Sequence, residues 1–252
     1  MKIVKKILII LAWLCLFGAI GFTVYFAYSE WLSVRCQSIV VNINPNSPRF
    51  LDEDEIVGMI EKSGEPIIGQ KLFAININKL ESKLSTFTTL DNVEIFRKVD
   101  SKGISFKGKL VISVDERTPV VRFKSSTEDY YMDQNGIKVP VSPKYVERIL
   151  LATGTVPADE TIKKSLLKMA GFVNMDEFWK AQIEQIFIQE NGEVLLVPQV
   201  GDCLIEFGTP DDFELKFRNL KAVYQQGFKN LGWNRYKTIS VKYRNQVVCT
   251  KK

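Results

Sequence analysis

Two pairs of neighbouring acids are the residues of this chain whose types and spacing come closest to hydrolytic chemistry. Paired carboxylates can serve as acid and base, or as acid and nucleophile, when both reach one scissile bond. Asp115 and Glu116 are consecutive at the end of an alternating apolar run, so on a strand their side chains should point to opposite faces. Asp211 and Asp212 precede a helical pattern and are expected to cap that helix. Both pairs are therefore predicted to be structural.

Histidine is absent from the 252 residues. Its absence excludes Ser-His-Asp and Cys-His nucleophile pairs and most zinc or iron ligation. The sequence also lacks a GxSxG elbow, a GxGxxG turn, a P-loop and a CxxC motif. Trp179 and Trp233 are expected to be buried rather than to stack on a sugar. We predict no enzymatic activity, no cofactor, no metal ion and no small-molecule substrate.

The charge balance and the composition describe a packed protein. A formal charge of +5 at pH 7, from 34 basic and 29 acidic residues, is too small for a nucleic-acid footprint. Apolar residues make up 46% of the chain, which is enough for a hydrophobic core. The length allows two modest domains beside a membrane segment.

An uncharged apolar stretch over 7–29 predicts a transmembrane helix. At about 1.5 Å per residue it can cross a hydrocarbon core of about 30 Å. A signal peptide is the alternative, because Ala27 and Ser29 suit the positions before a cleavage site. The apolar region of a signal peptide normally has about 7 to 15 residues, so a retained helix is favoured.

The flanks of this stretch predict its orientation. A basic tail over 1–6 precedes it, while only Glu30 and Arg35 closely follow it. The positive-inside rule then places the tail in the cytoplasm and everything beyond Trp31 outside it. We expect a single-pass inner-membrane protein whose bulk lies in the periplasm.

Small side chains recur at every fourth residue of the same stretch and could let a second helix pack closely. Small residues are also common in membrane helices generally, and no GxxxG motif strengthens the pattern. The predicted helix-packing face consists of Cys15, Ala19, Thr23 and Ala27.

Residues 36–117 carry the pattern strand, helix, helix, strand, strand. Alternating apolar residues over 39–43 predict the first strand, and the acids over 52–55 give the first helix a capping box. A second helix is predicted to begin near residues 76–78. Two further strands follow, joined by a glycine-containing loop over 100–108.

Basic residues crowd that loop, and Asp100 is the only acid close to them in sequence. A solvated hairpin tip is the ordinary explanation for such a run. Contact with anionic headgroups or an acidic partner is the alternative, because a basic patch near a membrane gains Coulomb attraction. The basic residues are Arg97, Lys98, Lys102, Lys107 and Lys109.

Residues 118–252 predict a β domain that helices interrupt. Helices are expected over 159–172 and after Asp212, and Asn191-Gly192 is a strong hairpin signal. The fold class is therefore α+β, with the N-terminal helix, a β-α-α-β-β domain and a mixed β domain. Strands are expected at 120–123, 130–132, 138–140, 183–189, 193–197, 203–207, 238–243 and 246–250.

The order of these features resembles the FtsQ/DivIB family of bacterial cell-division proteins. In the first unit, which resembles the family's polypeptide-transport-associated (POTRA) domain, the resemblance rests on Ile39-Val40-Val41, the helix from Asp52, Lys71-Leu72-Phe73 and the segment Leu110–Pro119. In the second, which resembles the C-terminal β domain, it rests on Tyr131-Met132-Asp133, Lys216-Phe217 and the segments 197–201 and 246–249. The loop over 100–108 departs from the family's usual tight hairpin.

The resemblance implies a bitopic scaffold at the division site. Such a scaffold binds FtsB and FtsL and, through them, regulates septal peptidoglycan synthesis. Two other classes stay open. One is an envelope transport or assembly factor, although these usually carry repeated POTRA domains and one copy is visible here. The other is an anchored cell-wall hydrolase that uses carboxylates alone.

The last two predicted strands are expected to form the main partner-binding edge. A terminal strand often borders its sheet, and an unpaired edge offers N–H and C=O groups to an extended peptide. The resembled family also binds FtsB through its C-terminal strands. The alternative is an internal core strand. The predicted binding residues are Ile239, Val241, Lys242, Tyr243, Arg244, Gln246, Val247, Val248, Cys249 and Thr250.

Cysteines bear on this alternative. Cys203 and Cys249 fall on separate predicted strands of one domain, in a compartment that would be oxidising. A disulfide between them requires Cα atoms within about 7 Å of each other. Otherwise they are small buried hydrophobic residues.

Overall fold

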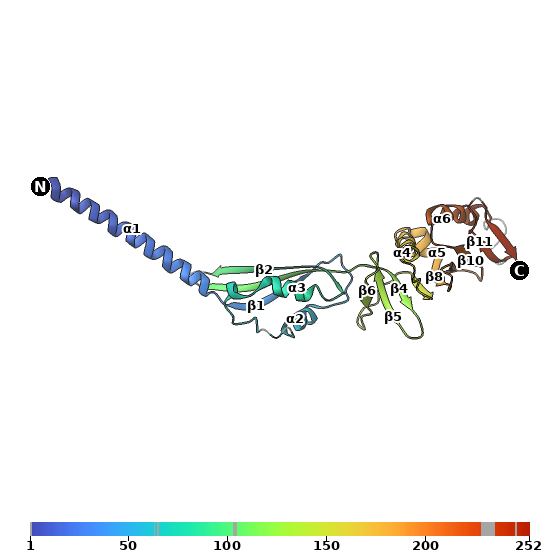
Figure 1. Cartoon of the computed structure of the whole chain (residues 1–252), viewed down its shortest axis with the longest axis horizontal. Coiled ribbons are helices and arrows are strands. Elements are labelled where there is room, and N and C mark those ends of the chain that lie inside the picture. Colours follow the sequence, from blue (N-terminus) through green and yellow to red (C-terminus); the bar gives the residue numbers. More distant parts are fainter. Residues whose placement is uncertain (1, 63, 65, 103–104, 228–234, 245) are drawn as a thin grey trace. The chain divides into compact units, whose positions relative to one another are not determined.

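The computed structural model describes residues 2–62, 64, 66–102, 105–227, 235–244 and 246–252. The chain forms two compact units (Figure 1). The first unit contains Met1–Pro45 and Leu51–Asp115, and the second contains Asn46–Phe50 and Glu116–Lys252. The fold is α+β as predicted, with an apolar N-terminal helix, a small α+β unit and a larger β-rich unit.

Helix α1 (Lys2–Ser33) is the one helix in the described residues that is long and apolar enough to cross a membrane. The stretch over 7–29 lies inside it, but the helix continues to Ser33 rather than ending at Ser29. Both serine hydroxyls donate to carbonyl oxygens of the preceding turn at 2.8 Å, so these polar residues are accommodated within the helix. The four small residues of the predicted packing face are exposed along α1, and their pairing with another helix stays a prediction.

The first unit folds in the predicted order of strand, helix, helix, strand, strand. Strand β3 is central in a three-stranded sheet, with β1 parallel to it on one side and β2 on the other. Ile56 and Leu80, one from each helix, pack with Ile112 of β3 in a single core. The elements are β1 (Cys36–Ile43), α2 (Glu53–Glu61), the 3-10 helix η1 (Leu72–Ala74), α3 (Ile77–Leu84), β2 (Leu90–Lys102) and β3 (Ser105–Glu116).

Capping side chains begin both helices of this unit. The Asp52 carboxylate accepts a hydrogen bond from the Glu55 backbone N–H at 2.9 Å, and the Glu55 carboxylate accepts one from the Asp52 N–H at 3.0 Å. Asn76 caps α3 by accepting from the Lys79 N–H at 3.1 Å. The predicted capping box and the start of the second helix are therefore confirmed.

The hairpin between β2 and β3 corrects one prediction. Instead of a loop over 100–108, β2 runs to Lys102 and β3 begins at Ser105. Gly108 lies within β3. A larger residue would not fit there, because its Cβ atom would lie 2.6 Å from the Arg35 carbonyl oxygen. A glycine that permits close backbone approach looks the same in sequence as one that marks a loop.

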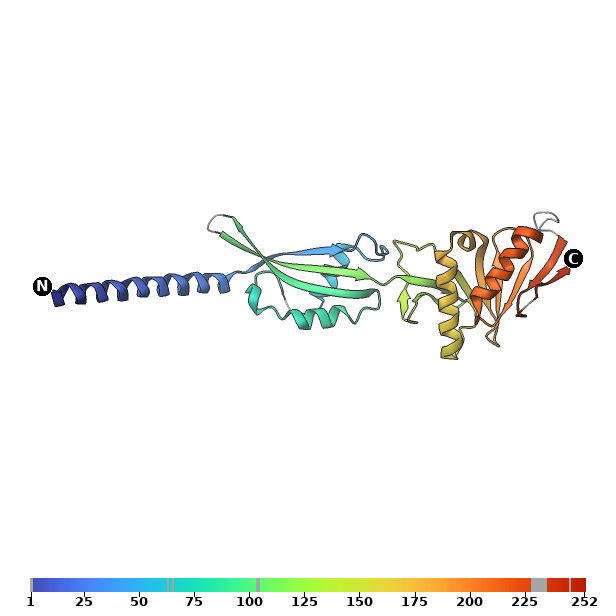
Figure 2. The same ribbon diagram turned by 90° about the horizontal axis from the view of Figure 1, so that it is seen from above.

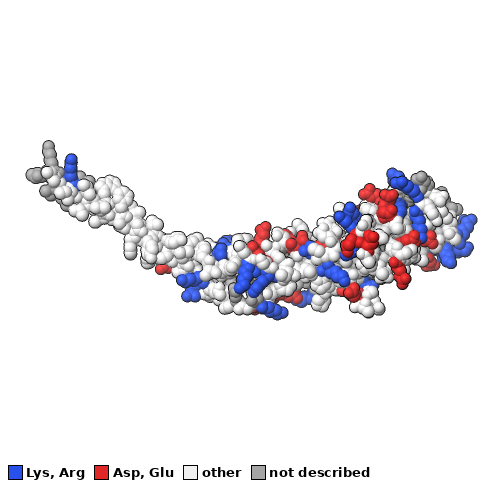
Figure 3. All heavy atoms as spheres, in the orientation of Figure 1, with Lys and Arg blue, Asp and Glu red and all other residues white. Residues whose placement is uncertain are grey.

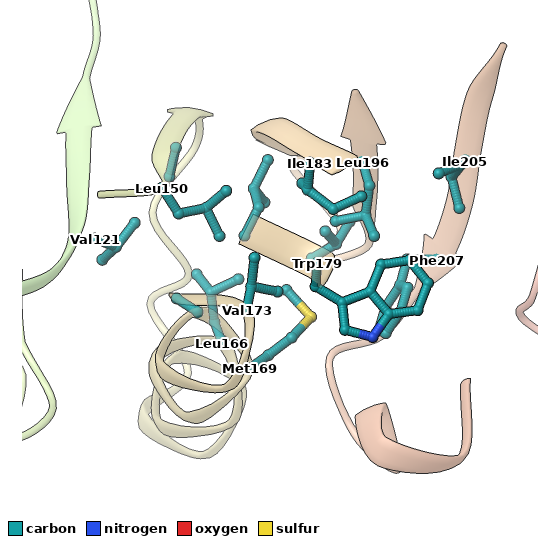
Figure 4. Packing of buried hydrophobic residues seen from close by; sticks show 14 of the residues in the cluster. Val121, Leu150, Leu166, Met169, Val173, Trp179, Ile183, Leu196, Ile205 and Phe207 are labelled. Carbon is teal, nitrogen blue, oxygen red and sulfur yellow. The ribbon is translucent and has the colours of Figure 1, made fainter. Parts of the chain in front are cut away.

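A nine-stranded mixed sheet forms the second unit, in the order β12-β11-β10-β9-β8-β7-β4-β5-β6. Figure 2 shows helices of this unit, in yellow and orange, beside its strands. Its core is filled from helices as well as strands. Figure 4 shows Met169 and Trp179, from α4 and α5, beside Leu196 and Phe207 of the sheet. The elements are β4 (Pro119–Lys124), β5 (Asp129–Asp133), β6 (Lys138–Pro140), β7 (Leu151–Gly154), α4 (Glu160–Met175), α5 (Glu177–Gln182), β8 (Ile183–Ile188), β9 (Val194–Pro198), β10 (Leu204–Gly208), α6 (Phe213–Ala222), the π-helix η2 (Val223–Gly227), β11 (Tyr236–Ser240) and β12 (Val248–Lys251).

Short elements account for most differences from the predicted second unit. The sequence predicts neither β7, which has 4 residues, nor α5, which has 6, because such lengths show no clear periodicity. Strands β11 and β12 are shorter than the predicted 238–243 and 246–250. Trp179 is buried as expected, whereas Trp233 lies outside the described residues.

The boundary between the units also corrects the predicted domains 36–117 and 118–252. Residues 46–50, which follow β1, belong to the second unit, as does Glu116. Phe50 is 2% exposed and packs with Tyr131 and Val139 in a small core of its own. Its backbone N–H donates to the Glu116 carboxylate at 3.1 Å. The loop over 46–50, which connects β1 and α2 of the first unit, therefore contributes a core residue to the second unit.

Candidate protein-binding edge of the second unit

Strand β12 lies at one end of the sheet order and, among the described residues, pairs with β11 alone. The pairing is antiparallel, with Ile239 opposite Cys249 and Ser240 opposite Val248. The terminal strand thus borders its sheet, as the sequence predicts. Its other side presents backbone groups that a further strand could pair with, although binding there stays a prediction.

The direction of the backbone donors along β12 follows from one hydrogen bond. The Lys252 N–H donates to the Arg235 carbonyl oxygen at 3.1 Å, so it faces β11. N–H groups alternate in direction along a strand, and the even-numbered residues of β12 therefore also donate toward β11. The N–H groups of Cys249 and Lys251 point to the open side. These two donors are the ones that an incoming strand would use.

Side chains of this terminal segment alternate between solvent and core. Val248 is 43% exposed and Thr250 is exposed, as is Gln246 before the strand. Val247 and Cys249 are half-buried and pack against the main core of the unit. Two faces with the expected membership are therefore present.

Two of the predicted binding residues lie in the core instead. Ile239 and Val241 are each 1% exposed. The reason is that β11 is an interior strand with β10 on its other side, so its inward side chains join the main core. Their side chains are therefore not accessible to a partner.

Lys242 has a structural contact that the sequence does not suggest. Its Nζ donates to the Glu193 carboxylate at 2.6 Å, and its aliphatic stem packs over Gly208. The hydrogen bond and the charge of Lys242 lower the pKa of Glu193, and Glu193 raises the pKa of Lys242 in turn. This pair ties the segment after β11 to the start of β9.

Tyr243 and Arg244, between β11 and β12, are exposed members of the predicted set. Tyr243 is 55% exposed. The Arg244 guanidinium lies 3.7 Å from the Asp212 carboxylate in an exposed ion pair, which leaves its other donors accessible to a ligand. The ring and the guanidinium are therefore available for contact beside the open edge.

A groove of about 630 Å³ runs between α6 and the terminal strands. Its lining combines apolar side chains, among them Val223 and Val247, with the basic side chains of Arg218 and Arg244. The α6 residues of the groove are absent from the predicted site, although Leu215, Arg218 and Ala222 recur at helical spacing on the face away from the buried Phe217. The remaining lining residues are Asn219, Gln226, Tyr236, Gln246 and Cys249.

Positive charge surrounds the open edge. Lys and Arg side chains gather at the end of the second unit that carries β11 and β12 (Figure 3). They include Arg235, Lys237, Lys251 and Lys252, all exposed. Lys252 lies 3.4 Å from Asp202, so part of this charge is balanced. An extended segment with acidic side chains would complement the surface.

Cys203 and Cys249 are free thiols in the structure. Ile239 of β11 pairs with Ile205 of β10 on one side and with Cys249 of β12 on the other. Strand β11 therefore lies between β12 and β10, and β10 begins just after Cys203. Burial raises the pKa of both thiols, so they are protonated at neutral pH. Cys249 itself also raises the pKa of Cys203, so the two thiols lie near each other, and a bond between them stays a prediction.

The two pairs of neighbouring acids do not converge on a common site. Asp115 accepts from the Asn44 amide at 2.8 Å inside the first unit, whereas Glu116 is 3% exposed and accepts from Phe50 in the second. Asp212 precedes α6 with a φ of 47° and makes no side-chain capping bond, so the predicted cap is wrong. Asp211 instead lies 3.5 Å from Lys216.

Comparison with known families identifies both units. The profile described as FtsQ/DivIB, C-terminal related, matches residues 118–250, which is more than half of the chain. A POTRA-like domain matches residues 34–103. A comparison with curated proteins gives no match. FtsQ/DivIB proteins form a non-enzymatic scaffold family of bacterial cell division, and this chain belongs to that family.

Proposed function

We propose that this chain is a single-pass division scaffold that binds FtsB- and FtsL-type proteins and thereby helps to control septal cell-wall synthesis. The observation that carries the proposal is the open β12 edge beside the groove under α6, in a chain of this family. The scaffold acts by binding alone, without catalysis, cofactor or small-molecule substrate.

The partner adds a strand to β12. Its carbonyl groups accept from the Cys249 and Lys251 N–H groups, and this backbone pairing supplies affinity that depends little on the partner's side chains. Specificity comes from the neighbouring surface. An apolar side chain of the partner enters the groove beside Val247, and acidic side chains meet Arg218 and Arg244 of its lining.

Replacing Lys251 tests the backbone contact directly. Lys251→Pro removes an N–H that faces the open edge, and edge strands tolerate proline on that side. Lys251→Ala is the matched control, because it removes the same ammonium group and keeps the N–H. We expect the proline variant to bind an FtsB-type periplasmic segment about five- to tenfold more weakly than the alanine variant, in titrations of the full chain in detergent. Equal affinities of the two variants would refute strand addition.

Topology and location are parts of the same proposal. The basic tail over 1–6 is cytoplasmic, α1 spans the inner membrane, and both units lie in the periplasm at the division site. Protease added outside spheroplasts should digest both units. Survival of the units while the tail is cut would reverse the orientation. Depletion should give undivided filaments, and uniform envelope staining of the protein would argue against a division role.

A further inference from the structure

A cluster of aromatic side chains lies where α1 meets the rest of the first unit. The Trp31 ring, in the last turn of α1, lies 5.7 Å from the Phe73 ring and 6.1 Å from the Phe106 ring, measured between centroids. Despite these contacts, Trp31 is 42% exposed and Phe106 is 41% exposed. Leu32 adds a further exposed apolar side chain. We call Trp31, Leu32, Phe73 and Phe106 the juxtamembrane cluster.

The chain passes from α1 into the unit without a linker. Val34 is 5% exposed and belongs to the core of the unit, only one residue after α1 ends. The Leu72 N–H donates to the Val34 carbonyl oxygen at 2.8 Å, and the Cys36 N–H donates to the Gln70 carbonyl oxygen at 2.9 Å. The juxtamembrane cluster is therefore held within a few residues of the apolar stretch over 7–29.

Basic residues lie close in sequence to this cluster. Across residues 29–36, 69–73 and 105–109, Glu30 is the only acid, whereas Arg35, Lys71, Lys107 and Lys109 are basic. Lys109 is paired with Asp100 at 2.8 Å. Lys71 and Lys107 are exposed and lie within two residues of Phe73 and Phe106 in sequence, and Lys71 lies opposite Arg35 in a β-bridge.

We propose that this face of the first unit is a docking surface for anionic phospholipid headgroups. Aromatic rings with one apolar and one wet side suit the interfacial region, and that is where the end of a spanning α1 must place them. Each ammonium group near an anionic surface strengthens the attraction by about fivefold. The surface would hold the first unit against the membrane by more than the covalent link to α1.

Two of the basic residues in this region have structural hydrogen bonds and are therefore poor probes of lipid binding. Arg97 donates to the Leu72 and Ile75 carbonyl oxygens at 3.0 and 2.7 Å, so its guanidinium serves the fold. Arg35 likewise donates to the Gly69 carbonyl oxygen at 2.6 Å. Lys71 and Lys107 are the informative positions, because their exposed ammonium groups can be modified in the folded chain.

Amine-reactive footprinting of the full chain in nanodiscs tests the proposal, which rests on α1 spanning the bilayer. Discs of phosphatidylcholine alone are compared with discs that also contain phosphatidylglycerol, and mass spectrometry measures acetylation of each lysine. Lys164, exposed on α4, is the internal reference. In the anionic discs we expect Lys71 and Lys107 to react several-fold more slowly relative to Lys164. Salt at about 1 M should remove the difference, because it shortens the screening length to about 3 Å.

Two outcomes would overturn the proposal. Unchanged relative rates in both kinds of disc would show that no headgroup covers the lysines, and equal slowing in both would show proximity without recognition of charge. A matched pair of variants sharpens the result. Phe106→Glu should restore the reactivity of Lys71 and Lys107 in anionic discs, whereas Phe187→Glu, at a residue of the second unit that is also 41% exposed, should leave it unchanged. Failure of the chain to incorporate into discs would instead contradict the proposed anchor.

Discussion

The two edges of the nine-stranded sheet, β6 and β12, differ in how far they are protected from pairing. Strand β6 has 3 residues and includes Pro140, whose nitrogen cannot donate. Lys138 at its start lies 4.1 Å from the centre of the Tyr130 ring and 3.6 Å from the Glu128 carboxylate. Strand β12 contains no proline, and its Val248 side chain is 43% exposed.

Natural proteins blunt the edges that must not pair, with short strands, proline and lysine. The β6 edge has all three devices, and Phe50 and Val141 pack beside it. The β12 edge is also short, with 4 residues, and it carries Lys251, whose backbone N–H faces outward, but it has no proline. The absence of proline from β12 fits the proposed binding of a partner strand at that edge.

The largest expected effect comes from removing the packing beside the β6 edge. Phe50→Ala deletes a ring that is 2% exposed and should lower the free energy of unfolding of the second unit by about 3 to 5 kcal/mol. Thermal unfolding followed by circular dichroism measures the loss. Phe187→Ala, at a residue that is 41% exposed, should change it by less than about 0.5 kcal/mol. Similar losses in the two variants would contradict the assignment of residues 46–50 to the second unit.

At the other edge, Val248→Pro should detach β12. Its N–H faces β11, so proline removes a hydrogen bond within the sheet at a cost of about 1 to 3 kcal/mol. The rest of the sheet stays folded because β11 keeps its pairing with β10. We expect cooperative melting and partner binding at least about tenfold weaker. An unfolded chain would favour a core role for the strand, and wild-type affinity would exclude β12 as the binding edge.

A third comparison separates structure from chemistry. The double variant Asp115→Asn with Glu116→Gln keeps the shape of both side chains and should cost about 1 to 2 kcal/mol, mostly from the charged hydrogen bond to Phe50. Division should continue, which complementation of a depleted strain measures. Complete loss of division by a folded variant that still binds its partner would reveal a catalytic role.

The smallest expected effect concerns the pair of Lys242 and Glu193. Lys242→Met should lower the free energy of unfolding by about 0.5 to 1 kcal/mol at pH 7, because the pair is only partly buried. The pKa of Glu193 is lowered in the folded state, so the stabilisation is present above its unfolded pKa of about 4.3 and disappears as the pH falls through the folded pKa. Denaturant titrations should show a smaller difference between the variant and the wild type at pH 3 than at pH 7. An equal difference at both pH values would indicate packing over Gly208 instead.

Much of the fold can be predicted because its signals are local. The capping box at Asp52 and Glu55 and the alternation along β1 and β3 depend on neighbours in sequence. The hairpin glycine Gly108 misleads because its neighbour is Arg35, which is distant in sequence. Strand β7 is missed because pairing with β8 and β4 on both sides, rather than its own pattern, makes it a strand.

The candidate site divides in the same way. The exposed and half-buried faces over 246–250 can be predicted from the alternation of the residues. The burial of Ile239 and Val241 cannot, since it depends on β10 lying beside β11. From sequence alone, either of two faces of α6 could be buried. The packing of Phe217 into the core decides this, and it leaves the opposite face to line the groove.

The sequence by itself determined the apolar N-terminal helix, most of the strands and helices of the two units and the absence of histidine, because each depends on composition or on periodicity within one segment. The resemblance to the FtsQ/DivIB family rests instead on short motifs and their order along the chain. Tertiary structure alone decided that residues 46–50 support the second unit, that the two sheet edges differ and that Trp31 lies against Phe73 and Phe106. These features require segments that are far apart in the chain to meet. No local pattern predicts such a contact, because its favourable energy arises between the two distant segments and only once both are folded.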